Sequence, residues 1–165
     1  MKKLIILTLI LAPMAVFAQK FGHFNSQQLM SDMPEIKAVQ TELQNLENQY
    51  KKEIDAMQTE LKTKYDAFQA QKDSLPQGVQ QRRMQEMQDL DQRIQQTSQT
   101  YSEDLQKKQV EKMQPIQQKI INAIKEIGEA GGYVYIMDTT SGVPYISTTL
   151  STDVTAQLKS KLGIK

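Results

Sequence analysis

The sequence predicts an α+β protein in which a long antiparallel helical hairpin, a coiled-coil-like arm, extends from a small β-rich oligomerisation body. Between Gly22 and Gly128 the chain contains a single glycine, Gly78. Because glycine and proline punctuate secondary structure, their scarcity favours two long helices over this stretch. Segments typical of β-strands occur only towards the two ends. A hairpin would return the chain to its origin and bring those ends together.

Apolar residues in the predicted arm follow helical spacing. Ile36, Val39 and Leu43 have the alternating spacing of three and four residues found in heptads. Further along, the pattern shifts to a repeat of eleven residues, which indicates a straight or slightly right-handed seam. The residues of this second pattern are Leu46, Tyr50, Ile54, Met57, Leu61, Tyr65 and Phe68.

Facing residues of an antiparallel hairpin must have position numbers with a nearly constant sum, and the apolar residues of both halves meet this condition. The turn falls at residues 75–79, which contain Pro76 and Gly78. The seam is thin where Met57 faces Ser98 and where Leu46 faces Gln109, so the arm is expected to open most easily there. The predicted arm seam near the turn pairs Phe68 with Met87, Tyr65 with Leu90, and Leu61 with Ile94.

Residues 1–18 have the composition of a secretory signal peptide. Two lysines precede an apolar run, and Val16 and Ala18 are the small residues of a cleavage site, which predicts cleavage between Ala18 and Gln19. A transmembrane anchor is the alternative, but the run is shorter than the ~20 residues that a span needs. The chain has no cysteine, which excludes a lipoprotein anchor, a disulfide framework and a thiolate metal site.

The charge of the chain is nearly balanced. The chain has 20 basic and 19 acidic residues; without Lys2 and Lys3, 18 basic residues remain against the 19 acidic ones, so nucleic acid is not an expected partner. Basic residues nevertheless outnumber acidic ones near the turn. A solvated helical face is the first interpretation of these charges. The functional alternative is a tip that contacts anionic lipid headgroups or acidic segments of a partner. The predicted basic arm tip consists of Lys72, Arg82 and Arg83.

The body is predicted to comprise residues 19–33 and 128–165, and the arm residues 34–127. Strands are expected at 20–25, at 133–137 and, after a turn at Gly142, at 143–147, followed by a helix that Asp153 caps and Gly163 ends. Pro115 is expected to kink the second arm helix.

So small a sheet leaves unpaired edges, which predicts a homo-oligomer. The expected interface residues are Phe21, Phe24, Tyr133, Tyr135 and Ile136.

Three segments carry a resemblance to a known family: "NSQQLMSDMPEIKAVQTELQNLENQY", "MQPIQQKIINAIKEIGEAGGYVYIMDTTSGVPYI" and "STDVTAQLKSKLGI". Together with the N-terminal strand, they make the chain similar to the Skp/OmpH family of periplasmic chaperones over its mature length. The resemblance implies a jellyfish-like trimer whose helical arms enclose a cavity for unfolded outer-membrane proteins. It also implies a location in the periplasm.

The sequence favours an ATP-independent holdase chaperone, since no phosphate-binding loop of the type G-x-x-x-x-G-K-[ST] occurs. An exported coiled-coil spacer of the cell envelope without chaperone activity is the alternative. An enzyme is not expected: His23 is the only histidine, and carboxylates such as Asp104 are interpreted as ordinary surface charge. No catalytic residue, metal ligand or cofactor is predicted.

Overall fold

The structure is a computed structural model that describes residues 19–164. The predicted signal peptide, with Ala18 at its end, lies outside the described residues, whereas Gln19 is the first residue described. Contacts within the chain define two compact units. The arm unit is Met33–Gln118; the body unit joins the residues up to Asp32 with those from Lys119 onward. Residues 119–127, which the sequence assigned to the arm, are grouped by these contacts with the body.

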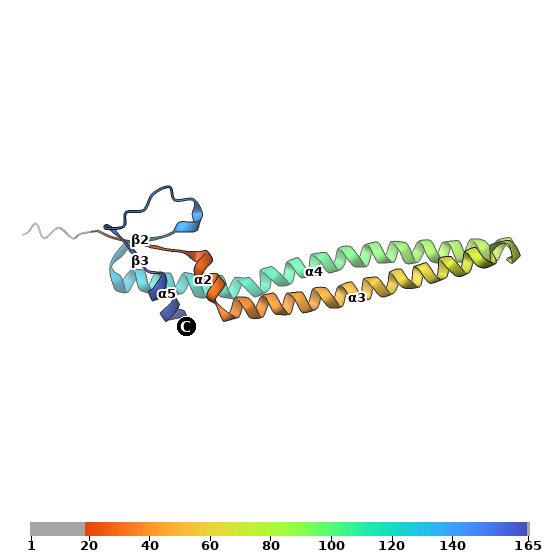
Figure 1. Cartoon of the computed structure of the whole chain (residues 1–165), viewed down its shortest axis with the longest axis horizontal. Helices are drawn as coiled ribbons and strands as arrows, with labels where there is room; N and C mark the ends of the chain where they lie inside the picture. The colour runs from red at the N-terminus through yellow and green to blue at the C-terminus, as the bar shows by residue number, and fades with distance from the viewer. Residues whose placement is uncertain (1–18, 165) are drawn as a thin grey trace, which may run out of the picture. The chain divides into compact units, whose positions relative to one another are not determined.

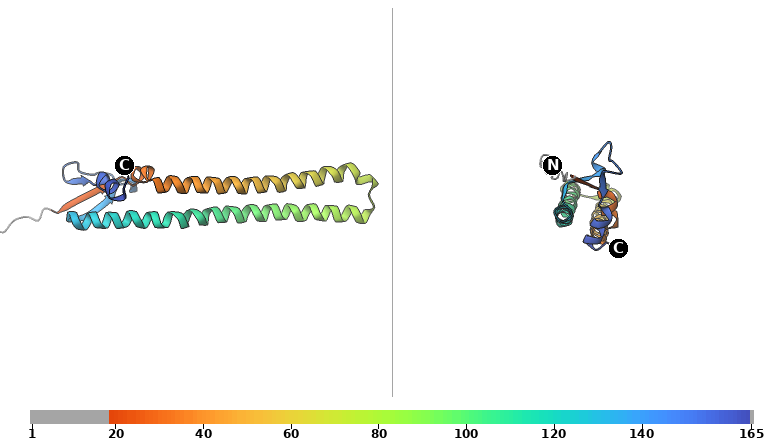
Figure 2. Two further views of the ribbon diagram at one scale, coloured as in Figure 1. Left: turned by 90° about the horizontal axis from the view of Figure 1, so that it is seen from below. Right: turned by 90° about the vertical axis from the view of Figure 1, so that its left-hand side faces the viewer.

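Two long helices make up the arm unit and run side by side in opposite directions (Figures 1 and 2). α3 spans Pro34–Gln71, and α4 spans Gln77–Gly131 and so continues beyond the arm unit. Pro34 occupies the first turn of α3, where its missing N–H costs no hydrogen bond. Pro115 lies inside α4 without ending it, and the kink predicted there stays a prediction.

The turn of the hairpin contains a short 3₁₀ helix, η1 (Lys72–Ser74). The side-chain amide of Gln80 donates to the carbonyl oxygens of Lys72 and Leu75, at 3.0 and 2.9 Å. The N–H of Val79 donates to the Pro76 carbonyl at 2.9 Å. These bonds satisfy carbonyl groups that the end of one helix and the turn would otherwise expose. Gln80 therefore stabilises the turn, in addition to Pro76, whose role there the sequence predicts.

The body unit contains a three-stranded sheet of order β2-β1-β3. β1 (Lys20–Phe24) is central and pairs in parallel with both β2 (Tyr133–Asp138) and β3 (Ser151–Asp153). The unit is completed by the helices α2 (Ser26–Asp32) and α5 (Thr155–Leu162) and the 3₁₀ helix η2 (Thr139–Ser141).

The predicted hairpin of strands 133–137 and 143–147 is wrong in its second half. Residues 143–147 form a loop, and the third strand is β3, on the far side of β1. Pro144 lacks the N–H that a strand would need, and the Ser147 hydroxyl accepts from the N–H groups of Thr149 and Leu150, which closes a local turn. Gly142 ends η2 in the left-handed conformation at φ 78°.

The core of the body unit lies between its two short helices and the sheet. Leu29, Val154 and Leu158 are fully buried, and Phe24 and Leu162 nearly so. Two ion pairs join α5 to the rest of the body unit. Lys159 pairs with Asp32 of α2 at 2.7 Å, and Lys161 pairs with Glu126 of α4 at 2.5 Å. Asp153 accepts from the Thr155 N–H at 2.8 Å at the start of α5, and Gly163 ends the helix at φ 74°.

Candidate functional site

Two tyrosines face each other midway along the arm unit. The rings of Tyr50 on α3 and Tyr101 on α4 are stacked, with centroids 3.8 Å apart and an interplanar angle of 6°. The Tyr50 hydroxyl donates to Asp104 on α4 at 2.7 Å, and the Tyr101 hydroxyl donates to Glu53 on α3. Each helix thus supplies one ring and one carboxylate. We call these four residues the tyrosine clamp.

The clamp shifts the titration of both phenols. The hydrogen bond to Asp104, together with partial desolvation and nearby negative charge, raises the pKa of Tyr50 to about 12. The hydrogen bond to Glu53 raises the pKa of Tyr101. A carboxylate acceptor favours the neutral phenol because a phenolate beside it would add a second negative charge. The interpretation of Asp104 as ordinary surface charge is therefore wrong.

Polar contacts dominate the neighbouring part of the arm unit as well. Lys112 on α4 pairs with Glu42 on α3, with Nζ–Oε distances of 2.8 and 3.0 Å. Between this pair and the tyrosine clamp lies a cavity of about 410 Å³, where Leu43 and Leu105 are surrounded by polar side chains, among them Gln109. The cavity lies where the sequence predicts a thin seam, because Gln109 replaces an apolar partner there.

The predicted seam residues near the turn differ in burial. Phe68, Leu90 and Ile94 are buried, and Leu61 and Met87 are half-buried. Tyr65 stays 52% exposed, so it contributes less to the seam than its spacing predicts. The rest of its surface is available to other molecules.

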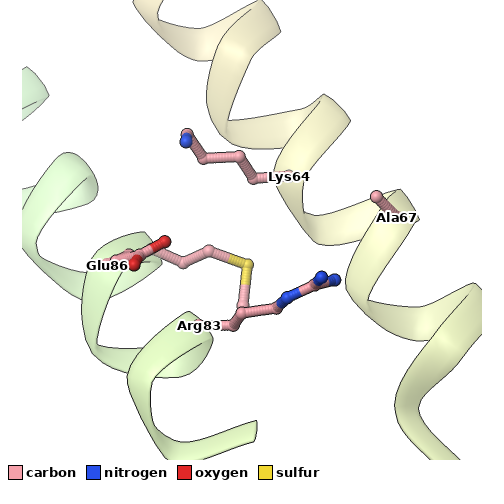
Figure 3. A pocket seen from close by; sticks show the side chains of 5 residues that line it. Lys64, Ala67, Arg83 and Glu86 are labelled. Atoms are coloured by element: carbon pink, nitrogen blue, oxygen red, sulfur yellow. The ribbon is translucent and has the colours of Figure 1, made fainter. Parts of the chain in front are cut away.

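The predicted basic arm tip spans the turn. Lys72 begins η1, and Arg82 is exposed on α4. Arg83 donates to the side-chain oxygen of Gln71 at 3.1 Å, which joins the two helices. It also lines a pocket of about 180 Å³ with Lys64, Ala67, Glu86 and Met87 (Figure 3). Figure 3 shows Lys64 extending from α3, opposite Arg83 and Glu86 on α4. Glu86 partly offsets the positive charge of this pocket.

The predicted interface residues lie on or beside the sheet of the body unit. The Phe21 ring contacts Tyr135 with centroids 4.8 Å apart, and Lys20 lies 4.5 Å from the centroid of the Tyr133 ring. Tyr135 is 49% exposed, whereas Phe24 is 6% exposed. Phe24 is therefore committed to the core of its own chain, and Tyr135 is the residue of the set best placed to meet another molecule.

Sequence reasoning missed the exposed apolar residues of the loop that follows η2. Tyr145 is 78% exposed and Leu150 is 75% exposed. Both line a pocket of about 250 Å³ that also contains Phe21, Tyr135 and Met137 from the sheet. At its edge, His23 Nδ1 and Ser151 Oγ are 2.8 Å apart. The available signal was the apolar content of residues 143–150, part of which was predicted to be a strand.

Within residues 19–164, no helix is long and apolar enough to cross a membrane. Over the same residues, no three side chains of the metal-binding types gather as a candidate ion site. The surfaces that the structure offers are therefore the tyrosine clamp, the basic arm tip and the apolar face of the body.

Comparison with known proteins identifies the family of this chain. The profile of the outer membrane protein family described as OmpH-like matches residues 20–162. A crystal structure from Caulobacter crescentus CB15, described as a candidate OmpH-like outer membrane chaperone, superimposes with a TM-score of 0.76 at 17% identity. The match covers 87% of this chain and 83% of that one, and it establishes the similarity of fold. A search of curated proteins finds no match. Because the family profile extends over nearly the whole described chain, the protein belongs to the OmpH-like family.

Proposed function

We propose that the protein is an ATP-independent holdase chaperone of the periplasm, which binds unfolded outer-membrane proteins and prevents their aggregation during envelope biogenesis. The observation that carries the proposal is the OmpH-like family match over residues 20–162. The chaperone description of the structure from Caulobacter crescentus supports the same role. Export by a cleaved signal peptide would deliver the chain to this compartment.

The surface of the arm unit suggests how a client would be held. Within the arm unit, Met33–Gln118, most exposed positions are polar, and the large apolar exceptions are few and separated: Tyr65 at 52%, Met84 at 44% and Val110 at 64% exposure. No continuous apolar groove results. Retention would therefore depend on many weak contacts and on confinement between the arms of several copies, and no nucleotide would be needed for release.

We infer that the working form is a homo-oligomer, with three copies as the family resemblance implies. The exposed residues Tyr135, Met137, Tyr145 and Leu150 lie around one pocket of the body unit, which gives a second copy an apolar surface to cover. Tyr135→Asp should dissociate the oligomer in sedimentation velocity runs, since it would place a charge in the covered face. Full assembly of this variant would contradict the assignment of the interface.

The basic arm tip is proposed to contact anionic lipid. Exchanging Lys72, Arg82 and Arg83 for glutamine should weaken binding to vesicles that contain an anionic phospholipid, as measured by flotation. The matched control exchanges Lys51, Lys52 and Lys107, which are exposed on the same two helices. Equal binding by both triple variants would favour a solvated helical face.

The decisive test of the holdase is aggregation of a client. A urea-unfolded outer-membrane β-barrel protein is diluted into buffer with and without the purified protein, and light scattering is followed. We expect suppression at about one oligomer per client. Shortening α3 and α4 by equal lengths on either side of the turn should reduce the size of client that is protected. Unchanged aggregation with a correctly assembled oligomer would favour the envelope spacer instead.

A further inference from the structure

We propose that Tyr50 and Tyr101 form a site of oxidative modification, at which a one-electron oxidant joins the two rings as dityrosine and links α3 covalently to α4. The proposal does not depend on the chaperone function. It rests on the geometry of the tyrosine clamp.

The rings of Tyr50 and Tyr101 lie close enough to couple. The two rings are stacked with centroids 3.8 Å apart and nearly parallel, and they belong to opposite helices. Among residues 19–164, no other pair of tyrosines is in ring contact. Both side chains are half-buried, so neither ring is fixed by packing on all sides. Two radicals formed on these rings would meet each other before either met a tyrosine of another chain.

A carboxylate accepts a hydrogen bond from each phenol. Oxidation of a phenol to the neutral phenoxyl radical removes one electron and one proton, and it is favoured where a base already accepts a hydrogen bond from the hydroxyl and can take up that proton. Asp104 accepts the hydrogen bond of Tyr50 at 2.7 Å, and Glu53 accepts that of Tyr101. Each proton acceptor therefore lies on the helix opposite its tyrosine. The raised pKa of Tyr50 means that a neutral phenol, not a phenolate, is the species to be oxidised.

Two one-electron acceptors each remove an electron, and the two phenolic protons pass to Asp104 and Glu53 and then to water. The two radicals combine through one bond between ring carbons ortho to the hydroxyls. Each of those carbons then loses its hydrogen as a proton, and each phenolic oxygen regains one. When hydrogen peroxide is the terminal oxidant, acting through a peroxidase, it takes up the two electrons and two protons and leaves as two waters.

The dityrosine bond would join α3 to α4 in the part of the arm unit that has the fewest buried apolar side chains. Tyr50 and Tyr101 lie between the Glu42–Lys112 pair and the buried cluster of Phe68, Leu90 and Ile94. A covalent bond there would prevent the two helices from separating or slipping in register. Oxidising conditions would thus convert a reversible clamp into a permanent one.

The test treats the purified protein with a peroxidase and hydrogen peroxide, isolates the band of monomer mass on a denaturing gel, and digests it with trypsin. Tyr50 is the only tyrosine of the tryptic peptide 38–51, and Tyr101 the only one of the peptide 94–107. We expect these two peptides to be recovered as one species that has lost two hydrogens and shows dityrosine fluorescence. Recovery from the monomer band identifies a bond within one chain.

Variants locate the bond. Tyr50→Phe and Tyr101→Phe should each abolish the linked peptide, while Tyr145→Phe, which removes the most exposed tyrosine, should leave its yield unchanged. Circular dichroism checks that each variant keeps its helices. Asp104→Asn combined with Glu53→Gln keeps both rings and should lower the yield at equal oxidant dose. An unchanged yield there would overturn the role of the carboxylates as proton acceptors.

Two results would overturn the site itself. One is dityrosine that forms mainly through Tyr65 or Tyr145, in chains whose peptides 38–51 and 94–107 remain separate. The other is the absence of any linked peptide under conditions that convert free tyrosine to dityrosine, since the oxidant would then be shown to be active.

Discussion

Ile136 on β2 packs against Gly22 on β1 so closely that a Cβ atom at position 22 would lie 3.0 Å from Ile136 Cγ1. The same atom would lie 3.2 Å from the Tyr133 ring. Gly22 and Ile136 are partners in the register of the parallel strands, and their contact fixes the distance between β1 and β2. The central strand therefore needs a residue without a side chain at this point.

Gly22→Ala should destabilise the body. The added methyl group forces Ile136 or Tyr133 to move, and overpacking of this kind costs about 1–3 kcal/mol. Urea unfolding followed by circular dichroism measures the change. Gly78→Ala is the matched control, because a Cβ atom there meets nothing within 4 Å. Gly78 lies in the first turn of α4, so its replacement should stabilise the protein by about 0.5–1 kcal/mol. Equal effects of the two substitutions would contradict the close approach of β2 to β1.

Leu158 on α5 is fully buried in the core of the body unit. Leu158→Ala should lower the free energy of unfolding by about 2–5 kcal/mol, the range for truncating a buried leucine. Val110→Ala is the comparison, because Val110 is 64% exposed on α4 and its replacement leaves no cavity. The difference between the two is read from urea unfolding curves. A small effect at Leu158 would mean that α5 is only loosely attached, despite the ion pairs of Lys159 and Lys161.

The tyrosine clamp should weaken at high pH. The pKa of Tyr50 is raised from an ordinary value of 10.0 to about 12, so its contribution to stability is complete below pH 10 and is lost as pH rises through 12. Urea unfolding at a series of pH values should show this loss in the parent protein and not in Tyr50→Phe. The absorbance of phenolate provides an independent titration. A Tyr50 hydroxyl that titrates at its ordinary pKa of 10.0 would contradict the hydrogen bond to Asp104.

The arm could be predicted from sequence because helical periodicity and the turn at Pro76 are local signals. The tyrosine clamp could not be predicted, because the spacing of Tyr50 and Tyr101 marks them as seam residues in the same way as leucine does. Nothing in their spacing shows that Asp104 and Glu53 reach across to the phenols. The clamp arises from the register of two helices, which apolar pairing fixes only approximately.

The body was harder to predict for a different reason. β1 pairs with β2 and β3, which lie far along the chain, and a run of alternating residues does not show whether its partner is parallel or antiparallel. Residues 143–147 have the composition of a strand, yet Pro144 and the turn at Ser147 prevent pairing. The predicted end of the last helix at Gly163 was confirmed, because a helix stop depends on local geometry, here a glycine in the left-handed conformation.

Acid should destabilise the body unit through two aspartates. Burial by itself raises the pKa of Asp138, but hydrogen bonds from Ser26 and Thr140 outweigh it and leave the pKa below its ordinary value of 3.8. Burial acts in the same way on Asp153, where hydrogen bonds from Thr155 and the charges of His23 and Lys159 lower the pKa. Their contribution to stability is therefore present above about pH 3.8 and is lost as pH falls through the lower values of the folded protein.

Asp138→Asn tests this acid response. The amide cannot accept as strongly from the Ser26 and Thr140 N–H groups, which lie 3.2 and 3.0 Å from the Asp138 carboxylate. The variant should be less stable at neutral pH and should lose less stability than the parent between pH 5 and pH 2, a window that spans the ordinary pKa of about 4. Asp73→Asn in the exposed turn of the arm is the control. Parallel pH profiles of the parent and Asp138→Asn would show that the link between η2 and α2 does not depend on the charge of Asp138.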